Sequence, residues 1–128
     1  MELNEQQALV QLLFIGASVD NRIEDSEIQY IKAVCAHEEI EIDLLDIKNR
    51  LFQEQSELLY HACIFKINQQ PLEKRLKALV YLFEMLLSDD LFLDEEDYYF
   101  KRVLKDLHVS ENQFRHAPTV FQKIILPS

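Results

Sequence analysis

The feature of this 128-residue sequence that most constrains its fold is an internal repeat. Residues 8–45 align with residues 77–114 without a gap, at a shift of 69 positions. Helical periodicity alone could make the apolar positions agree, but no core requirement places the acidic residues. The repeat therefore indicates a duplicated helix–turn–helix unit. Its matched polar and aromatic pairs include Asp20 with Asp89, Asp25 with Asp94, Glu27 with Glu96, Tyr30 with Tyr99 and Lys32 with Lys101.

Apolar residues recur at helical spacing along most of the chain. The clearest stripe runs from residue 72 to residue 87, and Pro71 suits the first turn of that helix, where a proline loses no needed N–H. No two-residue alternation typical of strands is present. Shorter stripes predict helices around residues 9–17, 28–35, 44–52, 58–63, 99–107 and, after Pro118, 118–125.

These patterns predict an all-α fold, a compact bundle of seven or eight helices with an internal pseudo-two-fold repeat. The length fits one domain over residues 1–128. We expect its repeat units at about residues 8–45 and 77–114, joined by the helical segment 46–76.

The charge balance narrows the classes of partner. The chain has 23 acidic and 13 basic residues, a formal net charge of −10. Such a surface repels phosphate backbones, so we expect neither nucleic acid nor anionic membranes as partners. Cations or basic protein surfaces suit it better. The single glycine also excludes a phosphate-binding P-loop or a dinucleotide fingerprint, which need several.

No targeting segment is apparent in the sequence. The N-terminus lacks the basic region of a signal peptide, and the longest apolar run, residues 12–17, is too short to span a bilayer. Cys35 and Cys63 are too few and too far apart for a disulfide framework or a metal knuckle. We therefore predict a cytoplasmic protein without a transmembrane segment, whose two thiols are reduced and packed in the core.

Each repeat unit contains an acidic turn between its two long helices. The turns, residues 20–27 and 89–96, both follow the pattern D-[ND]-x-apolar-x-D-x-E. This pattern is similar to the second half of an EF-hand loop, which also needs oxygen ligands at its first and third positions. With Glu27 as the last ligand, those positions would hold Gly16 and Ser18, and in the second unit they hold apolar residues. An EF-hand is therefore not favoured.

Two helix–turn–helix units of this type, in an all-helical domain of this size, resemble the TerB-like (tellurite-resistance) family. The resemblance covers residues 8–45 and 77–114. It implies an all-helical fold with internal pseudo-symmetry, an association with tellurite resistance and stress response, and no established catalytic activity. It also implies a surface cluster of acids suspected of binding a metal. In this chain the matching acids are Asp20, Glu27, Asp89 and Glu96.

The chain departs from the family pattern at two positions of each turn. The glycine of the pattern is replaced by Asn21 and Asp90, two residue types that tolerate left-handed backbone, so we expect a positive φ at both. The small hydroxyl residue before the second helix is replaced by Glu24 and Leu93, which removes the Ser/Thr half of a capping box.

The four acids of the turns allow two interpretations. As helix caps, they would complement the helix dipole and accept unpaired backbone N–H groups. As ligands, they would hold a hard divalent cation such as calcium, magnesium or manganese. Caps and turns are far commoner than ion sites, which favours the first interpretation. The density of acids over residues 89–97 supports the second, because so many carboxylates cannot all serve as caps.

Three other features concern the surface. One of the adjacent Tyr98 and Tyr99 must point away from the core and could contact a partner. Phe121, Ile124 and Ile125 could close the core or form a docking tail. The third feature is a run of acids expected to be a solvated face, made up of Glu38, Glu39, Glu41, Asp43 and Asp46.

Two functional hypotheses follow from these observations. The first is a non-enzymatic, TerB-like stress-response or scaffold domain whose acidic face binds a basic partner protein, with a divalent cation at Asp20, Glu27, Asp89 and Glu96. It assigns no catalytic and no cofactor-binding residue. The second is a metal-dependent hydrolytic enzyme that uses the paired carboxylates. A concave site where acids converge would favour the enzyme, and a flat patch the interaction domain.

Overall fold

The computed structural model describes residues 3–19, 22–53, 55–88 and 93–116. This part of the chain is helical and contains no strand, which confirms the predicted all-α class. None of its helices is both long and apolar enough to cross a membrane. Its helices are α1 (Glu5–Ala17), α2 (Asp25–His37), α3 (Leu44–Gln53), α4 (Ser56–Asn68), α5 (Leu72–Leu86), α6 (Asp94–Asp106) and α7 (Glu111–Arg115).

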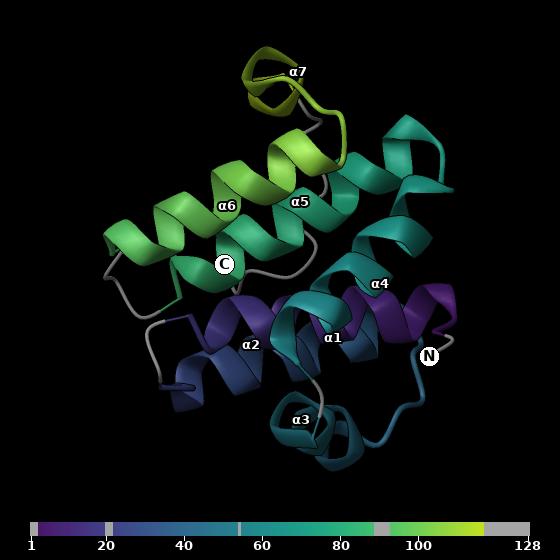
Figure 1. Ribbon diagram of the computed structural model, residues 1–128, viewed down its shortest axis with the longest axis vertical. Coiled ribbons are helices and arrows are strands. Elements are labelled where there is room, and N and C mark those ends of the chain that lie inside the picture. Colours follow the sequence, from purple (N-terminus) through teal and green to yellow (C-terminus); the bar gives the residue numbers. More distant parts are fainter. Residues whose placement is uncertain (1–2, 20–21, 54, 89–92, 117–128) are drawn as a thin grey trace.

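Helix α1 lies at the centre of the bundle (Figure 1), where it contacts α2, α3, α4, α5 and α6. Helices α5 and α6 run side by side, as do α1 and α2, and α4 packs across α1. The sequence explains this position, because every residue from Val10 to Ala17 is buried. A helix that is apolar on nearly all sides is stable only when neighbours surround it.

The only glycine of the chain sits where α1 meets α5 and α6. A Cβ atom at Gly16 would lie 2.9 Å from Leu82 Cδ1 and 3.0 Å from Tyr99 Cε2. Contacts this short are closer than normal packing allows. The missing side chain therefore lets α5 and α6 approach α1 closely.

Several local features recur at the 69-residue shift. Helices α2 and α6 begin and end at matched positions, and α1 and α5 end at matched positions. A left-handed residue follows α2 and α6, with φ of 56° at Glu39 and 58° at His108. Each helix closes with the hydrogen bonds of a Schellman cap. The matched bonds run from Ile40 N–H to Cys35 C=O (2.8 Å) and from Val109 N–H to Leu104 C=O (3.1 Å). A two-fold axis relating the two units remains a prediction.

Helix α7 was not predicted from apolar periodicity, because it spans only five residues. Its N-terminus is closed by a capping box: Ser110 Oγ accepts from Gln113 N–H at 3.0 Å, and Gln113 Oε1 accepts from Ser110 N–H at 2.9 Å. The S-x-x-Q pattern was the available signal. The helix predicted at 118–125, with the tail residues Phe121, Ile124 and Ile125, lies outside the described residues, as do Asn21 and Asp90 with their predicted positive φ.

Candidate functional site

Two of the four predicted site residues act as helix caps. Glu27 and Glu96 occupy the first turns of α2 and α6, and each is only 2% exposed. Glu27 Oε1 accepts a hydrogen bond from Glu24 N–H, and Glu96 Oε1 accepts one from Leu93 N–H, both at 2.9 Å. The Ser/Thr half of the capping box is absent, as expected, but its reciprocal half is present in both units. This geometry supports the cap interpretation for Glu27 and Glu96.

The other two predicted site residues, Asp20 and Asp89, lie outside the described residues. Within the part of the chain that the structure describes, no group of three or more His, Cys, Asp or Glu residues is arranged to hold a metal ion. The metal-binding role of the four acids therefore remains a prediction.

The start of α6 is the more acidic of the two matched helix termini. Four acids, residues 94–97, occupy its first turn, where they complement the positive end of the helix dipole. Glu96 is buried as a cap, and Asp97 pairs with Lys101 at 3.0 Å. Asp94 and Glu95 are exposed, and no ion pair joins them to another described residue. They remain available to a partner.

One of the two adjacent tyrosines of α6 is exposed and the other is buried, as predicted. Tyr99 is 5% exposed, and its hydroxyl donates a hydrogen bond to the Leu12 carbonyl at 2.9 Å. Tyr98 is 74% exposed. It stands between two shallow hollows, one that extends towards His61 and Lys105 and one that extends towards Val19. An exposed aromatic ring thus lies directly beside the acidic start of α6.

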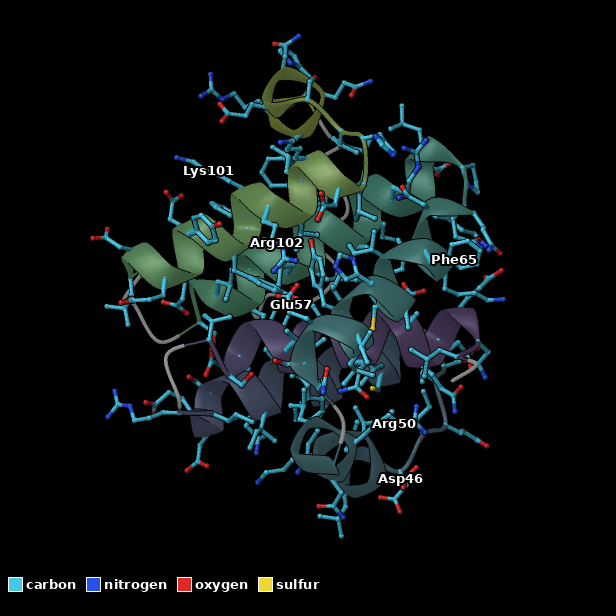
Figure 2. All side chains as sticks on the ribbon, viewed as in Figure 1. Asp46, Arg50, Glu57, Phe65, Lys101 and Arg102 are labelled. Carbon is cyan, nitrogen blue, oxygen red and sulfur yellow. The ribbon has the colours of Figure 1, made fainter. Side chains whose placement is uncertain are left out.

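A polar clamp joins α6 to α4 beside this surface (Figure 2), and its Arg102 lines both hollows next to Tyr98. The Arg102 guanidinium donates two hydrogen bonds to the Glu57 carboxylate, each 2.7 Å long, and lies 4.0 Å from the centre of the Tyr60 ring. Tyr60 in turn donates its hydroxyl to Asp106 at 2.7 Å. The hydrogen bonds from Arg102 hold the pKa of Glu57 below its usual value. Bidentate pairing restricts both side chains, so the clamp links α4 and α6 next to Tyr98.

The acidic run after α2 is only partly the solvated face that was predicted. Glu39, Glu41, Asp43 and Asp46 are exposed. Glu38 is half-buried and contacts Lys77 and Tyr81 on α5. No pattern in the run distinguishes Glu38 from its neighbours, because the contact depends on where α5 packs against the end of α2.

Both cysteines are free and buried, in agreement with the predicted packing role. Burial raises the pKa of the Cys35 thiol and raises that of Cys63 to about 12. Such thiols are protonated at neutral pH and poor nucleophiles. The nearby His37 and His61 are exposed and face away from them, so the described residues form no Cys–His pair along α2 or α4.

The fold and the surface together define an acidic, all-helical bundle domain whose described surface has an exposed tyrosine at an acidic helix start. Residues 6–119 match the family model described as Tellurite resistance protein TerB. The match covers most of the chain, which therefore belongs to the TerB family, as the repeated acidic turn indicated. Neither a curated protein nor a solved structure matches the chain.

Proposed function

We propose that this chain is a non-enzymatic TerB domain that binds a partner protein through the acidic start of α6, with Tyr98 at the centre of the contact. One observation carries the proposal: Tyr98 is 74% exposed and follows directly on the acidic turn that holds Asp94 and Glu95. Exposed tyrosines that a partner can desolvate are among the residues that contribute most to protein interfaces.

Charge decides the kind of partner. At a net charge of −10, long-range attraction favours a basic protein surface. A lysine or arginine of the partner can pair with Asp94 or Glu95 while lying over the Tyr98 ring, and a cation–π contact of this kind contributes about 0.5–2 kcal/mol. The polar clamp between α4 and α6 supports the proposal, because side chains that are already ordered lose less entropy on binding.

The proposal also includes a cytoplasmic stress-response role and a divalent cation at the acidic turns. Membership of the TerB family supports a role in tellurite resistance or stress response, and two free buried thiols are consistent with a cytoplasmic location. A divalent cation at the turns would use chiefly Asp20 and Asp89, because Glu27 and Glu96 each already accept a backbone N–H.

A hydrolytic enzyme is less well supported by the described residues. The carboxylates of the hollow bounded by α1, α4 and α5 are Glu5 and Glu38, and each has a lysine within 4.0 Å. In the more open hollow beside Tyr98, Asp97 pairs with Lys101 at 3.0 Å and Asp106 with Arg102 at 3.7 Å. Carboxylates paired at separate positions do not form the convergent acid–base pair that hydrolysis needs.

The partner surface can be tested with a defined probe, a short peptide of alternating arginine and leucine residues, followed by backbone amide NMR shifts. We expect the largest shifts at residues 94–102 and an affinity that falls as salt rises. Tyr98→Ala and Asp94→Asn/Glu95→Gln should each weaken binding at least tenfold. The matched control Glu39→Gln/Glu41→Gln removes the same charge elsewhere and should have little effect. Equal losses in the control and in the α6 variants would refute a specific surface on α6.

The cation is tested by thermal melts in chelator and in millimolar calcium, magnesium or manganese. A ligand that binds only the folded state stabilises it by about 2.7 kcal/mol at a hundredfold excess over Kd. We expect Asp20→Asn/Asp89→Asn to lose this gain, and Glu39→Gln/Glu41→Gln to keep it. If the metal effect is the same in both variants, the ion only relieves general acidic repulsion and the turns hold no specific site.

A further inference from the structure

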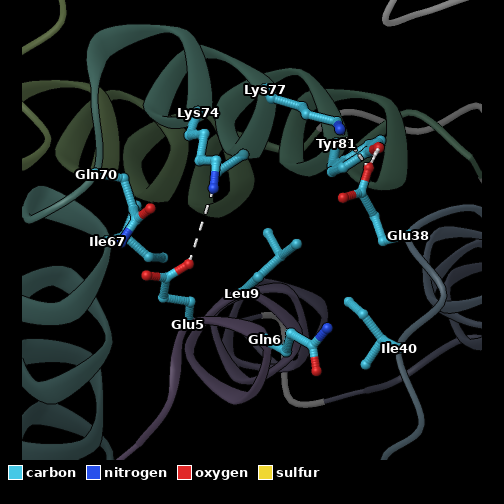
Figure 3. A pocket seen from close by; sticks show the side chains of 11 residues that line it. Glu5, Gln6, Leu9, Glu38, Ile40, Ile67, Gln70, Lys74, Lys77 and Tyr81 are labelled. Carbon is cyan, nitrogen blue, oxygen red and sulfur yellow. Dashed lines mark hydrogen bonds and ion pairs between the residues drawn. The ribbon is translucent and has the colours of Figure 1, made fainter.

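A hollow of about 200 Å³ lies on another part of the bundle, where the start of α1 faces the end of α4 and the start of α5 (Figure 3). It is more enclosed than the two hollows beside Tyr98. Its floor is aliphatic and its rim is charged, and the two halves of the rim differ in how firmly their charges are paired.

At one end of the hollow the charged side chains form a firm ion pair with each other. Glu38 accepts a hydrogen bond from the Tyr81 hydroxyl and pairs with Lys77 Nζ at 2.5 Å. The Glu38 and Lys77 side chains are only 23% and 30% exposed. Burial acts to raise the pKa of Glu38, but the hydrogen bonds from Lys77 and Tyr81 outweigh it and hold the pKa below its usual value. This end fastens the segment after α2 to α5.

At the other end the charges are held loosely. Lys74 Nζ lies 4.0 Å from Glu5 Oε2, and both side chains are more than half exposed. An ion pair this long and this exposed contributes little to stability. Either side chain can therefore leave the pair and bind a ligand at a small cost in free energy. Gln6 and Gln70 also line the hollow, and neither side-chain amide is hydrogen-bonded to a described residue. These amides can donate to a bound carboxylate.

The floor between the two ends is apolar. It is formed by Leu9, Ile40, Ile67 and Ala78, which come from three helices and from the segment after α2. A ligand with an aliphatic group would remove this surface from water. The hollow is smaller than the 300–1,000 Å³ or so typical of sites for drug-sized ligands, which limits the ligand to one small molecule.

We propose that this hollow binds a free aliphatic α-amino acid. The ligand ammonium pairs with Glu5, its carboxylate pairs with Lys74, and its side chain lies on the floor beside Leu9. A ligand with only a negative charge would be repelled by the Glu5 carboxylate, and a ligand with only a positive charge would be repelled by the Lys74 ammonium. Only a zwitterion with its two charges a few ångströms apart satisfies both. The proposal does not depend on the partner surface at Tyr98.

The test is a titration of the full-length protein with L-leucine, followed by backbone amide NMR shifts. We expect shifts centred on Leu9, Ile40 and Ala78, with a dissociation constant on the order of 1 mM, as befits a small ligand. Three analogues each lack one feature: isoamylamine lacks the carboxylate, 4-methylvalerate lacks the ammonium, and glycine lacks the aliphatic group. Each should bind at least tenfold more weakly than leucine.

Variants separate the specific site from a general charge effect. Lys74→Gln and Glu5→Gln change exposed side chains, and each should weaken leucine binding at least tenfold without changing the fold. Lys105→Gln, an exposed lysine on α6, makes the same change of charge and should bind leucine normally. The proposal is overturned if 20 mM leucine moves no amide of the hollow, if isoamylamine or 4-methylvalerate binds as well as leucine, or if Lys105→Gln weakens binding as much as Lys74→Gln.

Discussion

Gly16→Ala tests whether the close approach of α5 and α6 to α1 is part of the fold. Two opposing effects act at this position. Alanine is about 1 kcal/mol better than glycine inside a helix, and Gly16 lies within α1. The new methyl group would lie 2.9 Å from Leu82 Cδ1 and 3.0 Å from Tyr99 Cε2. Side chains must move to accept it.

The structure indicates that the steric effect is larger. Leu82 is fully buried, and the Tyr99 ring is tethered by the hydrogen bond from its hydroxyl to the Leu12 carbonyl. Overpacking a core of this kind costs about 1–3 kcal/mol. After subtraction of the propensity gain, we expect Gly16→Ala to destabilise the protein by about 1 kcal/mol. For 128 residues this lowers Tm by about 4 °C.

The assay is denaturant unfolding of a double-mutant cycle with Leu82→Ala. Leu82→Ala alone should cost about 2–5 kcal/mol, and the double variant should cost less than the sum of the single variants, because the methyl group added at position 16 gains the vacated space. A Gly16→Ala protein that is more stable than the native one, or a strictly additive cycle, would refute the close-packing argument.

Two further predictions concern buried hydrogen bonds. Glu84 accepts a hydrogen bond from the Tyr30 hydroxyl at 2.5 Å, and its Oε1 is unpaired among the described residues. Burial raises the pKa of the Glu84 carboxyl. The unfolded chain therefore loses this proton first, so native stability falls as pH rises above about 4.5 until the folded-state pKa is passed. Glu84→Gln should melt above the native protein at pH 7 but not at pH 3, and equal pH dependence in both proteins would contradict this. Tyr99→Phe should lower the free energy of unfolding in denaturant by about 1–2 kcal/mol. The exposed Tyr98→Phe should leave it almost unchanged, and similar losses in both variants would argue against the hydrogen bond from Tyr99 to α1.

The repeated turn shows how far a local pattern can be interpreted. Its acids and their spacing were sufficient to predict membership of the TerB family, which the family model confirms. They were not sufficient to assign a role to each acid, because a cap and a metal ligand call for the same residue type at the same helix terminus. The structure adds that Glu27 and Glu96 are each 2% exposed and each accept a backbone N–H, which supports the cap interpretation, and the metal-binding role stays a prediction.

The sequence by itself determined the helical class, the acidic net charge and the exposure of one of the adjacent Tyr98 and Tyr99, because each depends on composition or on the period of one helix. Only the tertiary structure decided which helices meet and what lies between them. It placed Glu38 against Lys77 and Tyr81, and Lys74 beside Glu5, although these partners lie far apart in the sequence. Such contacts depend on how whole helices pack, and a helical period specifies which face is buried but not which neighbour covers it.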